Sequence, residues 1–399
     1  MNTLSQLMTR SPIGPEPQGP VLGTAASFPQ PSPRRRALLV ILGAGALLGL
    51  ASPAWAQHRY LETDLVSDIP GLAAVTDPSL VNAWGLSRSA TSPWWVADNG
   101  TGLSTLYTGA GAGAKLGLTV TIPTSMGATP PSAPTGTVFN ASTTDFLAAP
   151  GKPGRFLFAT ENGTIAAWNS GTTAVTKVDW SGAAVYKGLT LGVRGTANFL
   201  YAANFFAGTV DVFDGNFVPV NLGPNAFRDW HLPKGYAPFN VQNIGGNIVV
   251  AFAKQSAEKF DEVQGPGNGF VDVFTPDGVL QMRLHGGRHL NAPWGLVQAP
   301  ADFGRASNLL LVGQFGTGKI AAFDPTTGHF RGFLRGADHR SIVIDGLWAL
   351  SFGNGGSAGP TNTLYFSAGI DDEAHGLFGS LTVLTDPVDN DGDQDCDDD

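Results

Sequence analysis

The chain has 399 residues, of which 53 are Gly and 28 are Pro, and 14% are charged while 42% are hydrophobic. This much Gly and Pro excludes a coiled coil, and the apolar content excludes a wholly disordered chain. The formal net charge of −9 argues against a nucleic-acid-binding surface, which needs clustered Lys and Arg.

The N-terminal segment has the organisation of an export signal. Three arginines at 34–36 precede an apolar run over residues 37–50, and Ala54-Trp55-Ala56 offers small residues for a signal peptidase. The run is shorter than the ~20 apolar residues of a membrane-spanning helix. We therefore predict a signal peptide with a long n-region over residues 1–56, no membrane span, and a periplasmic or extracellular location. Sec and twin-arginine export both remain open.

One sequence pattern occurs six times in the body of the chain. Each copy has an apolar segment opened by Gly or Trp-Gly, a continuous apolar run, and a Gly followed by alternating apolar and polar residues. The third copy illustrates it with Lys187-Gly188-Leu189, then Leu200 to Asn204, then Gly208 to Phe213. Alternation predicts a half-buried strand, and the continuous run predicts a strand covered on both faces.

The spacing of the copies indicates how they are arranged. Six copies share the 325 residues from Gln57 to Leu381, roughly 54 residues each, which is close to one four-stranded propeller blade. We therefore predict an all-β fold, a six-bladed β-propeller of four-stranded blades over residues 57–384. A two-sheet sandwich is the competing architecture.

The ends of the repeat array predict how the ring closes. The sixth copy shows three strands, whereas the segment from Tyr60 to Val66 is strand-like and precedes the first copy. We expect this N-terminal strand to become the outer strand of the sixth blade, because that pairing removes open sheet edges.

The repeats also resemble known families. Their inner strand opens with Gly and apolar residues, their second strand ends in Ala and a polar residue, and their third ends in Phe-Asp, as in NHL-repeat and gluconolactonase-like propellers. Five phrases resemble an uncharacterised bacterial secreted family: Leu65–Ala73, Asp98–Gly102, Tyr201–Phe205, Asn291–Leu296 and Asp345–Trp348. The resemblance implies the fold from about Tyr60 to Leu381. It does not imply one activity, since this fold hosts hydrolases, lyases and binding modules.

Polar residues recur where inner strands start and second strands end, and in this topology both lie on one face around the central channel. The predicted ring comprises Asn82, Lys187, Asn240, Gln242, Asn291 and Asp345 from inner strands, and Asp98, Glu161, Asn204, Lys254 and Gln314 from second strands. The alternative is that these side chains cap strand ends and bond to backbone amides.

Two sets of candidates follow from this ring. The ligand-binding candidates are Asn82, Asp98, Asn204, Asn240, Lys254, Asn291 and Gln314. The metal candidates are Asp98, Glu161, Asn204 and Asp345, since carboxylate and amide oxygens are the ligands that Ca²⁺ prefers. A bound cation would polarise a carbonyl or activate water.

Two loops overhang the same face. The loop with Asp371, Asp372, Glu373 and His375 offers an acid or a base, or else is a solvated acidic turn. With the ring, it gives the catalytic candidates Glu161, Asp345, Asp371 and His375. The loop from Gln255 to Asn268 carries Lys259, Asp261 and Glu262, and is either a lid or a mobile insertion.

The chain ends in an acidic tail over residues 385–399. Its aspartates Asp389, Asp391, Asp393 and Asp395 resemble the Asp-rich calcium loops of thrombospondin type 3 and dockerin-like repeats. The chain ends before the glutamate that would complete an EF-hand. A weak calcium site and a disordered solubilising tail are the two interpretations.

Three functions remain open. The leading one is an exported propeller that binds a small ligand or an extracellular macromolecule at its polar channel face, with Ca²⁺ as a candidate cofactor. The second is a calcium-assisted, lactonase-like hydrolase or lyase, and the third is a structural cell-surface module. The sequence contains no serine-hydrolase elbow, phosphate loop or zinc-protease motif.

Overall fold

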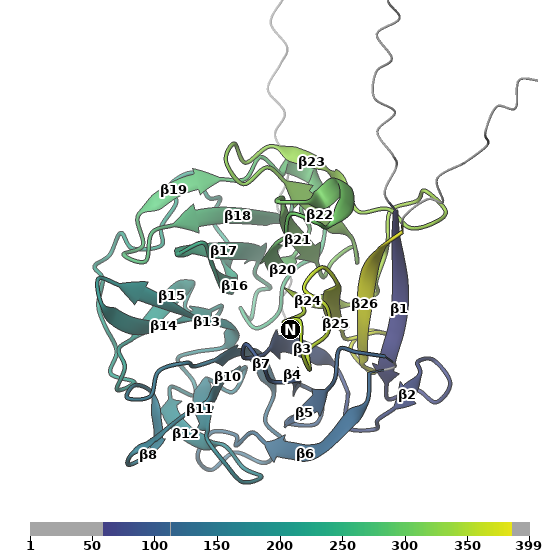
Figure 1. Cartoon of the computed structure of the whole chain (residues 1–399). Coiled ribbons are helices and arrows are strands. Elements are labelled where there is room, and N and C mark those ends of the chain that lie inside the picture. Colours follow the sequence, from purple (N-terminus) through teal and green to yellow (C-terminus); the bar gives the residue numbers. More distant parts are fainter. Residues whose placement is uncertain (1–58, 112, 385–399) are drawn as a thin grey trace, which may run out of the picture. The chain divides into compact units, whose positions relative to one another are not determined.

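Short β-strands are the main regular secondary structure in the part of the chain that the structure describes. The structure, a computed structural model, describes residues 59–111 and 113–384. Its sheets are arranged radially as a six-bladed β-propeller (Figure 1). The predicted fold is confirmed, and the sandwich alternative is excluded. The predicted signal peptide and the acidic tail, with Asp389, Asp391, Asp393 and Asp395, lie outside the described residues.

The blades follow one another in chain order, each from its inner to its outer strand. Blade 1 contains β3 (Ala83–Ser87), β4 (Trp94–Asp98), β5 (Leu103–Tyr107) and β6 (Lys115–Thr121). Blade 2 contains β7 (Pro134–Phe139), β10 (Phe156–Thr160), β11 (Thr164–Trp168) and β12 (Val175–Asp179), beside a hairpin of β8 (Leu147–Ala149) and β9 (Lys152–Pro153). Blade 3 contains β13 (Tyr186–Arg194), β14 (Ala197–Asn204) and β15 (Thr209–Phe213), and a single bridge from Phe213 to Pro219 marks its outer edge.

The second half of the ring is built in the same way. Blade 4 contains β16 (Tyr236–Ile244), β17 (Asn247–Lys254), β18 (Gly269–Phe274) and β19 (Leu280–Arg283). Blade 5 contains β20 (Pro293–Gln298), β21 (Leu310–Gln314), β22 (Ile320–Phe323) and β23 (Phe330–Phe333). Blade 6 contains β24 (Leu347–Phe352), β25 (Leu364–Ala368), β26 (Leu377–Leu384) and β1 (Arg59–Ser67), with β2 (Val75–Thr76) added at its edge.

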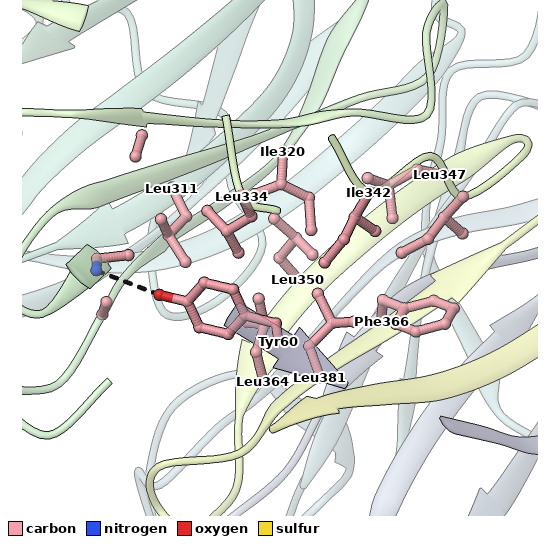
Figure 2. Packing of buried hydrophobic residues seen from close by; sticks show 14 of the residues in the cluster. Tyr60, Leu311, Ile320, Leu334, Ile342, Leu347, Leu350, Leu364, Phe366 and Leu381 are labelled. Atoms are coloured by element: carbon pink, nitrogen blue, oxygen red, sulfur yellow. Dashed lines mark hydrogen bonds between the residues drawn. The ribbon is translucent and has the colours of Figure 1, made fainter. Parts of the chain in front are cut away.

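Strand β1 closes the ring. It pairs antiparallel with β26, from Arg59 opposite Leu384 to Ser67 opposite Leu377. Figure 2 shows Tyr60 of β1 packed in the hydrophobic core that blades 5 and 6 share. The Tyr60 hydroxyl donates a 3.0 Å hydrogen bond to the carbonyl of Phe303 and accepts one from the backbone N–H of Ala306. The predicted closure by the N-terminal strand is confirmed.

The packing explains the sequence pattern of the repeats. Every residue of β4, β10, β21 and β25 is buried, as expected for strands covered on both faces by neighbouring blades. Near the axis the inner strands crowd together, and a Cβ on Gly85 would lie 2.4 Å from the carbonyl oxygen of Thr135. Glycine is therefore required there. Within the described ranges, no helix is long and apolar enough to cross a membrane.

Candidate functional site

A common register places equivalent residues of all six blades at one mouth of the channel. In each blade, the residue that follows the second strand donates its backbone N–H to the residue that precedes the inner strand, at 2.7–3.0 Å. The six donor and acceptor pairs are Asn99 and Asn82, Glu161 and Ala133, Phe205 and Val185, Gln255 and Gly235, Phe315 and Ala292, and Gly369 and Gly346. The residue after the second strand therefore marks the mouth in every blade.

The residue two positions after each acceptor lies on the inner strand, and these residues form the floor of the mouth. Trp84, Trp294 and Trp348 occupy this position in blades 1, 5 and 6, and we call them the aromatic floor; all three are buried. Trp84 and Trp348 stack with ring centroids 3.6 Å apart, and Trp294 meets both edge-on. The indole N–H groups of Trp84 and Trp348 both donate to the side-chain oxygen of Asn82. Hydrogen bonds thus fix the orientation of the floor.

Lys187 occupies the same inner-strand position in blade 3. Its side chain is 1% exposed, and its ammonium donates a hydrogen bond to Glu161 and lies 3.5 Å from Asp261. It also lies 5.1 Å from the ring centroids of Trp84 and Phe260. Burial acts to lower the pKa of Lys187, but the charge and hydrogen bond of Glu161 outweigh it, so the pKa is raised. The amine is protonated at neutral pH and is not a nucleophile.

Hydrogen bonds extend this pair around the mouth. The side-chain amide of Asn99 donates to the second oxygen of Glu161 at 2.9 Å. The amide of Asn82 donates to Asn99 at 3.3 Å and to Glu373 at 2.6 Å. A continuous network therefore runs from Lys187 in blade 3 to Glu373 in the last loop of blade 6.

The loop over residues 255–268 of blade 4 crosses the mouth. Gln255 anchors its start through a side-chain hydrogen bond to the carbonyl of Phe205, and Asn291 anchors its end by accepting the N–H of Gly265 at 2.7 Å. Between the anchors, Phe260 and Asp261 lie over Lys187. This segment, predicted as either a lid or a mobile insertion, lies over the charged centre of the mouth.

Carboxyl groups outnumber ammonium groups at this site. We call Glu161, Asp261, Glu262 and Glu373, together with Lys187, the mouth cluster. Burial raises the pKa of Glu262 to about 7; Lys187 opposes this rise, and the charges of Glu373 and Asp261 add to it. Burial also raises the pKa of Glu373, and the charge of Glu161 adds to that rise. The cluster is therefore short of positive charge, and Glu262 and Glu373 hold protons more tightly than usual.

The loop that carries Glu373 has a strained backbone. Asp371, Asp372 and Glu373 have φ values of +57°, +52° and +66°, a run of three non-glycine residues in the left-handed region. Such residues cost roughly 1–2 kcal/mol each. Asp345 holds the run by accepting the N–H of Asp371 at 2.8 Å, and Asn82 holds the Glu373 carboxylate. Strain of this kind is typical of functional sites.

The structure brings two of the predicted ligand-binding residues, Asn82 and Asn291, to the mouth and its lid. Three others bond within the fold. Asn204 bonds to its own blade through Val185 and Asp211, Asn240 donates to the carbonyl of Trp294, and Gln314 accepts from the N–H of Asn291. Lys254 is exposed at the end of β17. Asp98 is fully buried and lies next to Thr105 in blade 1.

The catalytic candidates are also spread apart. Glu161 lies in the mouth cluster, whereas Asp345 bonds to the backbone of the exposed Asp371. His375 contacts Asp68 through Nδ1 at 2.7 Å, which ties its loop to the end of β1. The hydrogen bond to Asp68 raises the pKa of His375.

The predicted metal ligands Asp98, Glu161, Asn204 and Asp345 lie in four separate hydrogen-bonding environments. In the part of the chain that the structure describes, no three His, Cys, Asp or Glu side chains are grouped to hold a metal ion. Calcium stays a prediction from the sequence.

Asn99 was absent from the predicted set, whereas Asp261, Glu262 and Glu373 were named only as residues of the two loops predicted to overhang this face. Successive side chains of a strand point to opposite sides, so Asp98 and Asn99 face different surroundings. In blade 2 the predicted residue, Glu161, is the first residue after β10. In blade 1 the first residue after β4 is Asn99, whereas the predicted Asp98 is the last residue of that strand. Aligning the six copies on Glu161 would have identified Asn99. The two loops were predicted to overhang this face, but the sequence does not show that Asp261, Glu262 and Glu373 meet beside Lys187.

Glu262 makes folding stability depend on pH. Its pKa is raised from 4.5 to about 7, so its contribution is fully present below pH 4.5 and is lost as the pH rises through 7. Between pH 4 and pH 8 we expect the free energy of unfolding of E262Q to fall by about 2 kcal/mol less than that of the wild type. Denaturant unfolding of wild type and variant from pH 4 to pH 8 measures it. Glu62 and Asp272 titrate in the same window, so only the difference between the two proteins counts. Parallel curves would contradict the expectation.

Comparisons with solved structures agree with the fold. A protein of unknown function from Bacteroides thetaiotaomicron superposes with a TM-score of 0.51 and 10% identity, over 82% of this chain and 77% of that chain. Virginiamycin B lyase from Staphylococcus aureus gives a TM-score of 0.44 and 12% identity, over 82% and 100%. A gluconolactonase from Xanthomonas campestris gives 0.37 and 14%, over 57% and 82%. At these identities the likeness concerns the fold alone.

Comparisons of sequence identify relatives. No family model matches the chain. Uncharacterized protein L690 of Acanthamoeba polyphaga mimivirus is 33% identical over 335 residues, covering 79% of this chain and 84% of L690. Uncharacterized protein R648 of the same virus is 31% identical over 329 residues, covering 79% and 78%. Both relatives are viral, so a bacterial origin and secretion stay predictions from the sequence. The chain belongs to the same family as L690 and R648 of Acanthamoeba polyphaga mimivirus.

Proposed function

We propose that the protein binds a small organic molecule carrying a protonated amine at the mouth of the propeller channel. The observation that carries the proposal is the composition of the mouth cluster, in which four carboxyl groups surround the single ammonium of Lys187. A second ammonium placed there would neutralise charge that the protein leaves uncompensated.

The electrostatic argument is direct. Glu262 and Glu373 hold protons more tightly than a solvated glutamate because they are partly buried among other carboxylates. A ligand ammonium would favour their ionised forms and form charge-assisted hydrogen bonds with them. An anionic ligand would meet repulsion from the same groups, so charge selects among ligands of similar size.

Aromatic and amide side chains border the charged centre of the mouth. Phe260 of the lid is 42% exposed and lies near the ammonium of Lys187, which itself sits over Trp84. Aromatic faces attract ammonium groups by about 0.5–2 kcal/mol. The side-chain amides of Asn82 and Asn99 supply neutral polar contacts beside the carboxylates.

A second candidate function is acid–base catalysis. Its supporting observation is Glu262, whose pKa of about 7 is suited to give and take a proton at neutral pH. Lys187 would then stabilise a developing negative charge beside it. This retains the predicted hydrolase or lyase alternative, without a metal step. Turnover of simple lactones that is lost in E262Q would favour it, and an absence of turnover would count against it.

Calorimetric titration with three matched four-carbon compounds tests the proposed function. We expect 1,4-diaminobutane to bind to the full chain, and 1,4-butanediol and succinate not to bind. E373Q removes one carboxylate of the mouth cluster and should weaken diamine binding by about tenfold. D372N is the control, since Asp372 is exposed on the same loop and outside the cluster. Equal binding of all three compounds, or an unchanged affinity in E373Q, would disprove the cationic preference.

Export to the periplasm or the exterior also belongs to this proposal. It rests on the arginines and the apolar run of residues 34–56. The ligand would then be met outside the cytoplasm. A macromolecular partner and a structural surface role stay predictions from the sequence.

A further inference from the structure

A second polar cluster lies where blade 1 faces blade 6, and it shares no residue with the mouth cluster. It consists of Asp77 from the loop after β2, Asp98 from the end of β4, and Thr105 and Tyr107 from β5. All four side chains are buried: Asp77 is 1% exposed and the others are 0% exposed. Two buried acidic side chains in one cluster need compensation, because an uncompensated buried charge is costly.

Asp77 is compensated. Its Oδ1 accepts the ammonium of Lys115 at 2.6 Å and the backbone N–H of Ser79 at 3.0 Å, and its Oδ2 accepts the hydroxyl of Tyr107 at 2.6 Å. Burial opposes ionisation, but these donors prevail and lower the pKa of Asp77. This carboxylate is charged.

Asp98 is not compensated. Neither carboxylate oxygen has a hydrogen-bond partner, and the hydroxyl of Thr105 also lacks one. The Thr105 hydroxyl lies beside Asp98, yet the two form no hydrogen bond of ordinary geometry. Burial raises the pKa of Asp98 well above its usual range; the nearby hydroxyl and backbone N–H of Thr105 oppose this rise without cancelling it, and the charge of Asp77 adds to it. Three buried oxygens of this cluster thus have no hydrogen-bond partner of ordinary geometry, which is uncommon in native proteins.

The equivalent place in blade 3 shows what a satisfied version looks like. The strand register makes Asn204 equivalent to Asp98 and Asp211 equivalent to Thr105. In blade 3, Asn204 donates to Asp211 at 2.9 Å, and Tyr186 and Thr209 donate to the same carboxylate. Blade 1 has the carboxylate of Asp98 and the hydroxyl of Thr105 at these two positions, and it lacks the amide donor. In blade 1 a positively charged species would therefore compensate Asp98, as the amide donor does for Asp211 in blade 3.

We propose that Asp77, Asp98 and Thr105 bind a small hard cation, Ca²⁺ or Na⁺, between blades 1 and 6. Such ions take carboxylate and hydroxyl oxygens as ligands, and Tyr107 offers a further oxygen. The site contains only two acidic residues. It is therefore not one of the groups of three or more His, Cys, Asp or Glu side chains that were considered above as metal sites. It also lies apart from the mouth cluster and is independent of the proposed function.

Lys115 is the natural competitor for this site. Its ammonium bonds to Asp77, and its side chain is 36% exposed, so it has access to solvent. A monovalent ion would replace the positive charge missing at Asp98 and leave Lys115 in place. A divalent ion would neutralise both carboxylates and release Lys115 towards solvent. In both cases the cluster becomes electrically balanced.

Thermal unfolding of the full chain tests the proposal. The protein is first treated with a chelator. Adding millimolar CaCl₂ should then raise the Tm by about 3–5 °C, or NaCl should raise it by the same amount relative to choline chloride at equal ionic strength. D98N keeps the shape of the side chain and should abolish this rise. D211N alters the equivalent blade-3 pair and should keep it. Binding of Ca²⁺ by the acidic tail does not depend on Asp98, so it would persist in D98N.

A second variant keeps the test decisive. K115M removes the competing ammonium and should lower the Ca²⁺ concentration at half-maximal stabilisation by about tenfold. A rise in Tm with only one of the two ions would identify the ion. If neither ion raises the Tm of the wild type more than that of D98N, the proposal is overturned. An unchanged half-maximal concentration in K115M would overturn the part given to Lys115.

Discussion

Replacing Tyr60 with Ala is expected to lower the free energy of unfolding by about 4 kcal/mol, because it removes a buried aromatic ring from the core where the two ends of the propeller meet. Tyr60 is 3% exposed and lies at the start of the strand that closes blade 6. Its ring packs 4.7 Å from that of Phe303, and its hydroxyl joins β1 to blade 5. Denaturant unfolding of the full chain measures the loss.

The variant Y60F separates the ring from the hydroxyl. It keeps the packing and removes the hydrogen bonds to Phe303 and Ala306, so we expect a smaller loss of about 1–2 kcal/mol. If Y60A were as stable as Y60F, closure by β1 would contribute little, and the fold would be held mainly by contacts among the other blades.

Replacing Lys187 with Met is expected to cost about 3 kcal/mol of stability at pH 8. The substitution leaves Glu161, whose side chain is 10% exposed, without the ammonium that neutralises it. At pH 5 the loss should be smaller, because an unpaired buried carboxylate takes up a proton instead. Unfolding curves at the two pH values measure the difference.

The double variant K187M/E161Q is the control for charge. Removing both members of the pair leaves no unpaired charge, so part of the loss in K187M should be recovered. If the double variant is no more stable than K187M, the loss comes from packing against the aromatic floor and not from the ion pair. That outcome would contradict the electrostatic account of the mouth.

The architecture could be predicted from the sequence because each blade repeats the same physical requirements. A second strand such as Phe156–Thr160 must be apolar on both faces, and an inner strand must carry Gly where its neighbour approaches. These requirements recur six times and leave a readable period. Closure was also predictable, since Tyr60 to Val66 had no partner in its own copy and blade 6 lacked a strand.

The site was predicted in part, and the reasons for the gaps are local. Asn82, Glu161 and Lys187 were identified because their positions follow from strand order. Asp98 was placed at the mouth because strand ends are uncertain by one residue, and one residue reverses the direction of a side chain. Glu262 and Glu373 lie on loops from opposite parts of the chain, and only the folded ring brings both beside Lys187.

The two proposed sites divide the charged residues of the propeller into separate roles. The mouth cluster gathers carboxylates under a lid and beside an exposed aromatic ring, as a site for an exchangeable ligand requires. The cluster around Asp98 is closed to solvent except at Lys115, as a site for a structural ion requires. Loss of one site should therefore leave the other intact.

The central claim is that the mouth cluster receives a ligand ammonium, and a crystal structure of the full chain grown with 1,4-diaminobutane tests it most directly. The account predicts a diamine nitrogen within about 2.7–3.0 Å of a carboxylate oxygen of Glu262 or Glu373, with the chain of the ligand beside Phe260. A mouth without the diamine at saturating concentration, or the diamine bound elsewhere on the propeller, would contradict it.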